Sequence, residues 1–237
     1  QLRSPPLWRV LPSSMLRPSN CQIVTMSWHP TKQFLALALK DDSIRFFNAK
    51  TNEFSEIILK HQFQKQVMNI EWRPLRDMLA IACQSGVCLW TLHREESADV
   101  TDFATCWMKH LKHASHAPVS SLSWSPDGSL LASVSPNDSA VCVWDVCRNS
   151  VTPLQATTPL CGNALIRWSP SGTRVFVGAS FQATDVQSKS IHAINKRAKG
   201  AFGVWSLHDN WRCERWTYCV DGVQDAVWLP NNDTLIL

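Results

Sequence analysis

The stretch Val119–Val146, VSSLSWSPDGSLLASVSPNDSAVCVWDV, contains three short apolar runs, and residues typical of a turn separate them. The first run ends at Ser125-Pro126-Asp127-Gly128 and the second at Pro136-Asn137-Asp138. Short strands separated by tight turns at this spacing predict an antiparallel meander. The third run closes on the dipeptide Trp144-Asp145, and such an ending is typical of one blade of a β-propeller.

Imperfect copies of this unit recur along the chain. Each opening strand ends in Trp-x-Pro, at Trp28, Trp72, Trp124, Trp168 and Trp228. These anchors are separated by 44, 52, 44 and 60 residues, against about 40–45 for a propeller repeat, so two intervals carry insertions. A third-strand aromatic follows each of the first four anchors, at Phe47, Trp90, Trp144 and Trp205. The pattern predicts an all-β, WD40-type β-propeller that is incomplete, with four four-stranded antiparallel blades and the start of a fifth.

The domain organisation follows from the same repeats. Residues 1–20 are rich in Pro and Arg and contain no acidic residue, which predicts an extended lead-in, or a docking peptide that uses Leu7, Trp8 and Val10. The partial propeller then occupies 21–237, with blades near 21–62, 63–114, 115–160 and 161–220 and the start of the next at 221–237. Because the chain begins with Gln1 and stops within an apolar run at Leu237, we expect a fragment or a truncated product.

The long fourth repeat contains a basic insertion, residues 182–200, with four Lys or Arg residues against one acidic residue. We interpret it as a solvated loop, and contact with nucleic acid or a nuclear-import signal is the alternative. No aromatic residue lies between Ala183 and Ala201, which argues against base stacking by this loop. Direct binding of nucleic acid is therefore not expected.

Composition and cysteine usage restrict the class of protein further. The chain is 45% hydrophobic and 18% charged, with a net charge of +4, an ordinary globular balance that permits a sizeable core. None of its nine cysteines is spaced C-x-x-C, so the spacing of a zinc ribbon is absent. We expect Cys83, Cys88 and Cys142, which lie in predicted strands, to be small buried residues in a reducing compartment.

The resemblance to WD repeats also implies a structural hydrogen-bonded tetrad. Its members are a His before the blade, a Ser or Thr in the second strand, an Asp in the following turn and the third-strand Trp. The residues in these places are His116, Ser133, Asp138 and Trp144. The Asp position holds Asp41, Gln84 and Lys199 in the other blades, so we expect the tetrad to be degenerate.

Signals for catalysis or metal binding are weak. The sequence has no G-x-S-x-G, no H-E-x-x-H and no Gly-rich phosphate loop, so we assign no catalytic residues and no cofactor. Asp41 and Asp42 are adjacent. On a strand they would face opposite sides, which argues against an acid–base pair. We interpret them as part of a β-turn between strands. His110, His113 and His116 would have to converge to hold a metal, and we prefer the structural role of His116 and assign no metal site.

Several segments resemble the aladin family of WD-repeat nucleoporins, and the resemblance runs from about Ser27 to the end of the chain. They are FLALALKDDSIRFFNA at 34–49, LAIACQSGVCLWTL at 79–92, the segment 118–146 with its ending SPNDSAVCVWDV, and WRCERW at 211–216. The insertion at 182–200 departs from the family because it is longer than expected there.

What the resemblance implies is a scaffold of the nuclear pore complex at the nuclear envelope, with no enzymatic activity, cofactor or small-molecule substrate. Its implied partners are other nucleoporins, notably a transmembrane pore-membrane nucleoporin. The implied processes are nucleocytoplasmic transport and the organisation of the mitotic spindle, with a location at spindle poles in mitosis. A WD-repeat adaptor in another complex, for ubiquitin ligation or RNA processing, is the alternative. No residue is assigned to partner binding.

Overall fold

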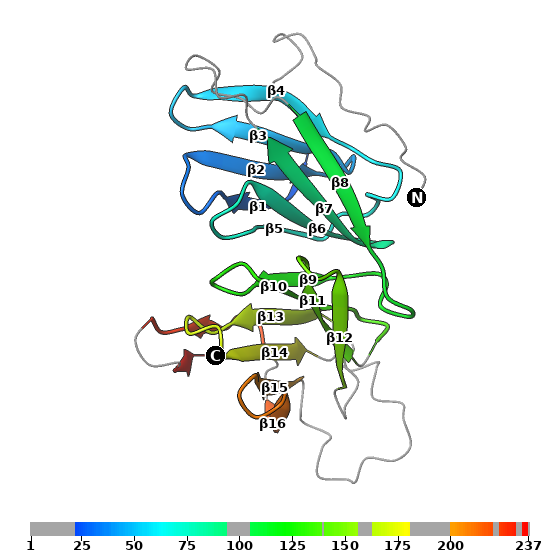
Figure 1. Cartoon of the computed structure of the whole chain (residues 1–237), viewed down its shortest axis with the longest axis vertical. Helices are drawn as coiled ribbons and strands as arrows, with labels where there is room; N and C mark the ends of the chain where they lie inside the picture. Colours follow the sequence, from blue (N-terminus) through cyan, green and yellow to red (C-terminus); the bar gives the residue numbers. More distant parts are fainter. Residues whose placement is uncertain are drawn as a thin grey trace. The chain divides into compact units, whose positions relative to one another are not determined.

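The computed structural model describes residues 22–93, 105–138, 140–155, 163–180, 200–219, 223–230 and 234–236. Every regular element in these residues is a β-strand (Figure 1), which confirms the all-β prediction. The predicted lead-in at 1–20 and residues 182–199 of the basic insertion lie outside the described residues. Within the described ranges, no helix is long and apolar enough to cross a membrane.

The chain divides into two compact units, residues 1–112 and 113–237. The first unit contains two four-stranded sheets. The strands of its first sheet are β1 (Ile23–Trp28), β2 (Phe34–Leu39), β3 (Ile44–Asn48) and β4 (Glu53–Leu59). Those of its second sheet are β5 (Asn69–Trp72), β6 (Met78–Cys83), β7 (Gly86–His93) and β8 (Thr105–Leu111).

The second unit repeats this arrangement and adds a short fifth sheet. One sheet contains β9 (Ser121–Trp124), β10 (Leu130–Val134), β11 (Ala140–Asp145) and β12 (Ser150–Gln155). The next contains β13 (Asn163–Trp168), β14 (Arg174–Ser180), β15 (Gly200–Ser206) and β16 (Arg212–Cys219). The two-stranded sheet is β17 (Val227–Trp228) with β18 (Leu235–Ile236). Neighbouring strands follow chain order throughout, which confirms four antiparallel blades and the beginning of a fifth.

Local turn chemistry explains why the first two strands of a blade pair so closely. After β9, the Gly128 amide donates to the Ser125 carbonyl at 2.8 Å, and after β13 the Gly172 amide donates to the Ser169 carbonyl at 2.9 Å. Both glycines have a positive φ, 69° and 70°, a conformation that costs little only without a Cβ atom. The turn predicted at Ser125-Pro126-Asp127-Gly128 therefore reverses the chain as expected, and the corresponding turn of the fourth blade has the same geometry.

The strand register places the repeated aromatic residues in equivalent positions. In every four-stranded sheet, the opening Trp pairs with an apolar residue of the second strand, which in turn pairs with the aromatic of the third. These rows are Trp28–Leu35–Phe47, Trp72–Leu79–Trp90, Trp124–Leu131–Trp144 and Trp168–Val175–Trp205. The spacing found in the sequence is thus a spacing of paired positions across each sheet.

Burial of these rows depends on the neighbouring blade. Trp72 and Trp168 are 3% and 7% exposed and belong to apolar clusters that join two blades of their own unit. Trp28, the equivalent residue of the first blade, is 57% exposed, and Met26 on the same face of β1 is 62% exposed. Among the described residues of the first unit, no sheet covers this face of β1.

A prediction concerns the packing of Val223 on the fourth blade. A Cβ atom at Gly178 in β14 would lie 2.7 Å from Val223 Cγ1 and 2.9 Å from Phe176 Cζ. Gly178→Ala should therefore destabilise the protein by about 1–3 kcal/mol through overpacking. The midpoint of thermal unfolding, followed by tryptophan fluorescence, measures the effect.

The matched background for this test is Val223→Ala, which removes Cγ1 and with it the closest clash. Gly178→Ala should lower the unfolding midpoint less in that background than in the wild type, because neighbouring sites are coupled. Equal losses in the two backgrounds would contradict the packing of Val223 against β14.

Candidate functional site

The four side chains expected to form the tetrad are hydrogen-bonded to one another. His116 Nδ1 lies 3.1 Å from Asp138 Oδ2, and His116 Nε2 lies 2.9 Å from Ser133 Oγ. The indole Nε1 of Trp144 donates to Ser133 Oγ at 2.8 Å. His116 and Ser133 are buried, with exposures of 1% and 0%. The second unit therefore contains a buried polar network that runs from a turn to the core of the blade.

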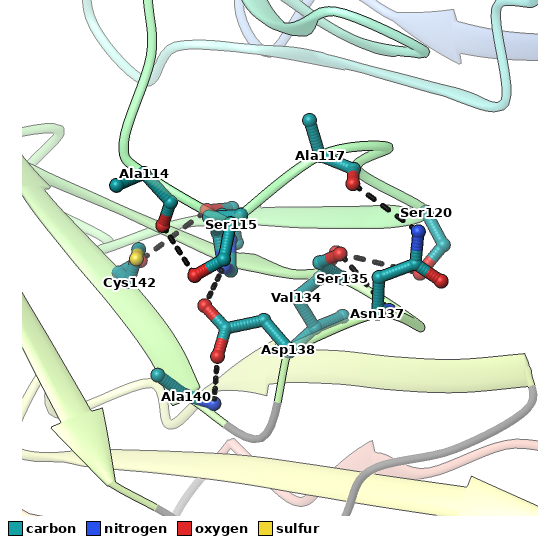
Figure 2. A network of polar contacts seen from close by, with 12 residues as sticks. Ala114, Ser115, Ala117, Ser120, Val134, Ser135, Asn137, Asp138, Ala140 and Cys142 are labelled. Carbon is teal, nitrogen blue, oxygen red and sulfur yellow. Dashed lines mark hydrogen bonds and ion pairs between the residues drawn. The ribbon is translucent and has the colours of Figure 1, made fainter.

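The elements around this network explain its geometry. Asp138 lies in the β10–β11 turn, where its Oδ1 accepts a hydrogen bond from the Ala140 amide at 3.0 Å (Figure 2). In the same turn, Asn137 Nδ2 donates to the Ala117 carbonyl at 3.4 Å. The turn is thereby tied to the segment that precedes β9, which carries His116.

The network also determines which proton His116 carries. An ionised Asp138 can only accept, so Nδ1 of His116 donates and Nε2 accepts from the Ser133 hydroxyl. Burial lowers the pKa of His116, and the Asp138 carboxylate opposes this shift. The contact between His116 and Asp138 is therefore a hydrogen bond of a neutral imidazole, and it does not form a full ion pair.

The Asp138–His116–Ser133 connectivity is that of a hydrolytic triad, but its surroundings differ from those of an active site. A nucleophilic hydroxyl must reach a substrate carbonyl, and Ser133 is completely buried. Its oxygen also accepts a hydrogen bond from Trp144 Nε1, which withdraws electron density from the would-be nucleophile. This arrangement holds the blade together, and it gives Ser133 no path to a substrate.

In the second blade, a different side chain, Gln64, accepts the hydrogen bond of the third-strand indole of Trp90. This role of Gln64 was not predicted from the sequence. Gln64 is completely buried, and its Oε1 accepts a hydrogen bond from the indole Nε1 of Trp90 at 2.8 Å. Its Nε2 donates to the carbonyls of Asp42 and Leu59 at 2.6 and 3.2 Å. The sequence signal that could have identified Gln64 is its position in the repeat. Gln64 precedes Val67 by the same interval by which His116 precedes Val119 in the third blade.

A second missed cluster joins the two blades of the first unit. His29 Nε2 donates to Asp77 Oδ1 at 2.9 Å, because His29 Nδ1 accepts the Thr31 amide. Lys32 Nζ lies 2.5 Å from both carboxylate oxygens of Asp77. The ring of His29 packs on Trp72, with the ring centroids 4.7 Å apart. These contacts bridge the β1–β2 turn and the β5–β6 turn.

Charge and hydrogen bonding in this cluster shift one titration strongly. The hydrogen bond from His29 lowers the pKa of Asp77 to about 2, burial opposes the shift, and Lys32 adds to it. The Asp77 side chain is only 24% exposed, so solvent screens its interactions in part. The lowered pKa then corresponds to about 2 kcal/mol of stabilisation of the folded state at neutral pH. The cluster of His29, Lys32 and Asp77 is thus an inter-blade clamp within the first unit.

The side chains of the remaining sequence candidates His110, Asp41 and Asp42 do not converge on one site. His110 Nε2 lies 3.1 Å from Ser85 Oγ, and its ring stacks on Phe63 with the centroids 4.8 Å apart. Asp41 Oδ1 accepts the Ser43 hydroxyl at 2.6 Å, whereas Asp42 Oδ1 accepts the Val67 amide at 3.1 Å. Asp41 and Asp42 lie in the turn between β2 and β3, as expected, and their carboxylates serve different partners.

Two family models match the chain over the blades just described. The model "WD domain, G-beta repeat" matches residues 104–145, and the model "Anaphase-promoting complex subunit 4 WD40 domain" matches residues 26–110. A chain in the structure titled "Crystal Structure of Mitotic Checkpoint Complex" aligns over 90% of this chain and 57% of its own length, with a TM-score of 0.62 and 16% identity. Sheet topology, register and these matches define the fold as that of a WD40-type β-propeller.

Within that class, the chain is similar to aladin of Arabidopsis thaliana, which confirms the resemblance seen in the sequence. The two are 30% identical over 162 residues, which represent 61% of this chain and 36% of aladin. The chain is also 27% identical over 135 residues to "Probable cytosolic iron-sulfur protein assembly protein 1" of Candida glabrata, covering 55% of this chain and 39% of that protein. The chain thus spans little more than a third of the length of these relatives.

The tetrad leads to a prediction about Ser133. Ser133→Ala removes the hydroxyl that both His116 Nε2 and Trp144 Nε1 contact, and it leaves these buried groups unpaired. The free energy of unfolding should fall by about 1–3 kcal/mol, as for a buried group without a partner. Ser120→Ala is the control, because Ser120 Oγ makes only a 3.4 Å contact with the Val134 carbonyl. Equal effects of both substitutions in chemical denaturation would contradict the tetrad.

The clamp leads to a prediction about acid stability. Because the folded pKa of Asp77 lies below its unfolded value of about 3.9, its stabilisation is complete above pH ~4 and is lost as pH falls towards 2. Asp77→Asn should lower the unfolding temperature at pH 6 and converge with the wild type near pH 2. The decisive measurement is the difference in unfolding temperature between the two proteins across this range.

The matched control for the clamp is Asp41→Asn. Burial raises the pKa of Asp41, but hydrogen bonds from Ser43 and the interaction with Lys60 lower it, and the net effect is a lowered pKa. The side chains of Asp41 and Lys60 are 50% and 46% exposed, so solvent screens their ion pair. A pH-dependent difference as large for Asp41→Asn as for Asp77→Asn would show that the clamp has no special role.

Proposed function

We propose that the chain is part of a non-enzymatic WD-repeat scaffold of the nuclear pore complex. In this role it binds other nucleoporins, notably a transmembrane pore-membrane nucleoporin, at the nuclear envelope and supports nucleocytoplasmic transport. The observation that carries the proposal is the 30% identity to Arabidopsis aladin over 162 residues. The organisation of the mitotic spindle, which the family resemblance implies, stays a prediction.

The described side chains support a scaffold over an enzyme. The buried polar groups of His116, Ser133 and Gln64 are engaged in hydrogen bonds that hold a blade together. His29 and Asp77 bridge two blades. When the reactive side chains serve the architecture, what remains for function is the outer surface of rigid sheets, which suits the binding of other proteins.

A second candidate function is that of a WD-repeat adaptor in another assembly. It is favoured by the match of residues 26–110 to the WD40 domain of anaphase-promoting complex subunit 4 and by the similarity to the iron–sulfur protein assembly protein. Both candidates rely on protein binding by the blades. They differ in the partners that would be found beside the protein in a cell.

The deciding experiment is proximity labelling in cells of the source organism. The protein that contains this chain is fused to a biotin ligase, and labelled proteins are identified by mass spectrometry. The proposal predicts enrichment of nucleoporins, including a membrane-spanning one, and a labelled rim at the nuclear envelope.

The control fusion carries the same ligase on an unrelated WD-repeat propeller of similar abundance. Nucleoporins enriched equally by both fusions would reflect general propeller surfaces and would contradict a specific role. Enrichment of another complex without nucleoporins would overturn the proposal in favour of the adaptor function.

A further inference from the structure

One cluster of metal-ligating side chains in the second unit is not explained by the tetrad alone. Donor atoms of His113, Asp138 and Cys142 all lie within 4.8 Å of one another. The three residues come from the segment before β9, from the β10–β11 turn and from β11. Figure 2 shows Asp138 and Cys142 beside the segment that carries Ala114 and Ser115. The fold therefore brings a nitrogen, an oxygen and a sulfur donor to one place.

An independent observation points to a ligand at this place. Nδ1 of His113 is buried and has no hydrogen-bond partner among the described residues. A buried polar atom without a partner costs about 1–3 kcal/mol, and in native proteins such an atom calls for an explanation, for example an ion. Asp138 and Cys142 are the groups of the cluster that could share that ion with His113.

The donor set selects the metal by its chemistry. Imidazole, carboxylate and thiolate together suit Zn²⁺, which prefers tetrahedral coordination by nitrogen, sulfur and oxygen. Bond lengths of about 2.0–2.3 Å place tetrahedral ligand atoms roughly 3.3–3.8 Å apart. Small side-chain rotations would bring three atoms that now lie within 4.8 Å into that geometry.

The tetrad supplies the orientation that such a site requires. Asp138 Oδ2 is held by His116 Nδ1 and Oδ1 by the Ala140 amide. Outer partners of this kind fix the direction of a ligating carboxylate and raise the affinity of a metal site. The cation would add a third interaction to Asp138 without replacing the two it already has, because each carboxylate oxygen has two lone pairs.

We propose that His113, Asp138 and Cys142 bind one Zn²⁺ ion, with a water molecule as the fourth ligand. The thiol of Cys142 becomes a thiolate on binding, and its proton passes to the solvent. The bound ion links the segment before β9 to β11, so it stabilises the blade that also holds the tetrad. No metal site was expected from the sequence, because His113 was considered there only together with His110 and His116.

The test uses the full 237-residue chain without an affinity tag. Co²⁺ is titrated first as a spectroscopic probe, because a Co²⁺–thiolate bond gives a charge-transfer absorption, and Zn²⁺ then displaces it. The wild type should bind one equivalent with thiolate absorption. Cys142→Val should abolish the absorption, and His113→Ala should weaken binding of both ions about tenfold or more.

Two control variants separate this site from other thiols. Cys147 is exposed, so Cys147→Ser should leave binding unchanged. Cys83 and Cys88 form a second thiol pair, with their Sγ atoms 3.8 Å apart, and Cys88→Val should also leave it unchanged. Loss of binding in Cys88→Val with retention in Cys142→Val would overturn the proposal, as would equal binding by every variant.

A further readout covers the case in which Cys142→Val does not fold. Zn²⁺ raises the melting temperature of a protein that binds it only in the folded state. The increase should be seen for the wild type and for Cys147→Ser, and it should be smaller in His113→Ala, whose side chain is only half-buried. An equal increase in His113→Ala would contradict the site even without data from the cysteine variant.

Discussion

The burial of the opening tryptophans of the second and fourth blades, Trp72 and Trp168, against the preceding blade of the same unit is the interaction on which the structure depends. A four-stranded sheet whose second strand is apolar on both faces, such as β2 or β6, must cover both faces with other sheets. Trp72 and Trp168 provide that cover within their units, and loss of such a side chain typically costs about 3–5 kcal/mol. In the first blade, where no described sheet of the first unit covers this face of β1, Trp28 is 57% exposed.

Within these apolar cores, polar side chains provide a hydrogen-bond acceptor for the indole N–H of two buried third-strand tryptophans. The third blade uses His116, Ser133 and Asp138 around Trp144, whereas the second blade uses Gln64 around Trp90. The difference has a physical reason, because Ile81 stands where Ser133 would be in the second blade. Without a hydroxyl at that position, a long amide reaches the indole directly. Both blades thus satisfy the indole N–H, and more than one side chain can do so.

These architectural roles bear on function. Groups that resemble catalytic machinery in isolation, above all the Asp138–His116–Ser133 series, are occupied within the fold. A repeat protein that commits its reactive groups to stability has its surfaces available for partners, in agreement with the proposed scaffold role. The proposed zinc site follows the same logic, since it would join two segments of one blade.

The sequence by itself determined the fold class, the four blades and the rows of aromatic residues. Trp-x-Pro, tight-turn residues and third-strand aromatics are local signals, and strand pairing between chain neighbours converts their spacing directly into register. It also indicated the four members of the tetrad, which the structure brings together. The tertiary structure alone decided the roles of Gln64, of the His29–Asp77–Lys32 clamp and of the His113–Asp138–Cys142 cluster. Their members lie up to 48 residues apart, and only packing between separate strands and turns brings such side chains within hydrogen-bonding or ligand distance.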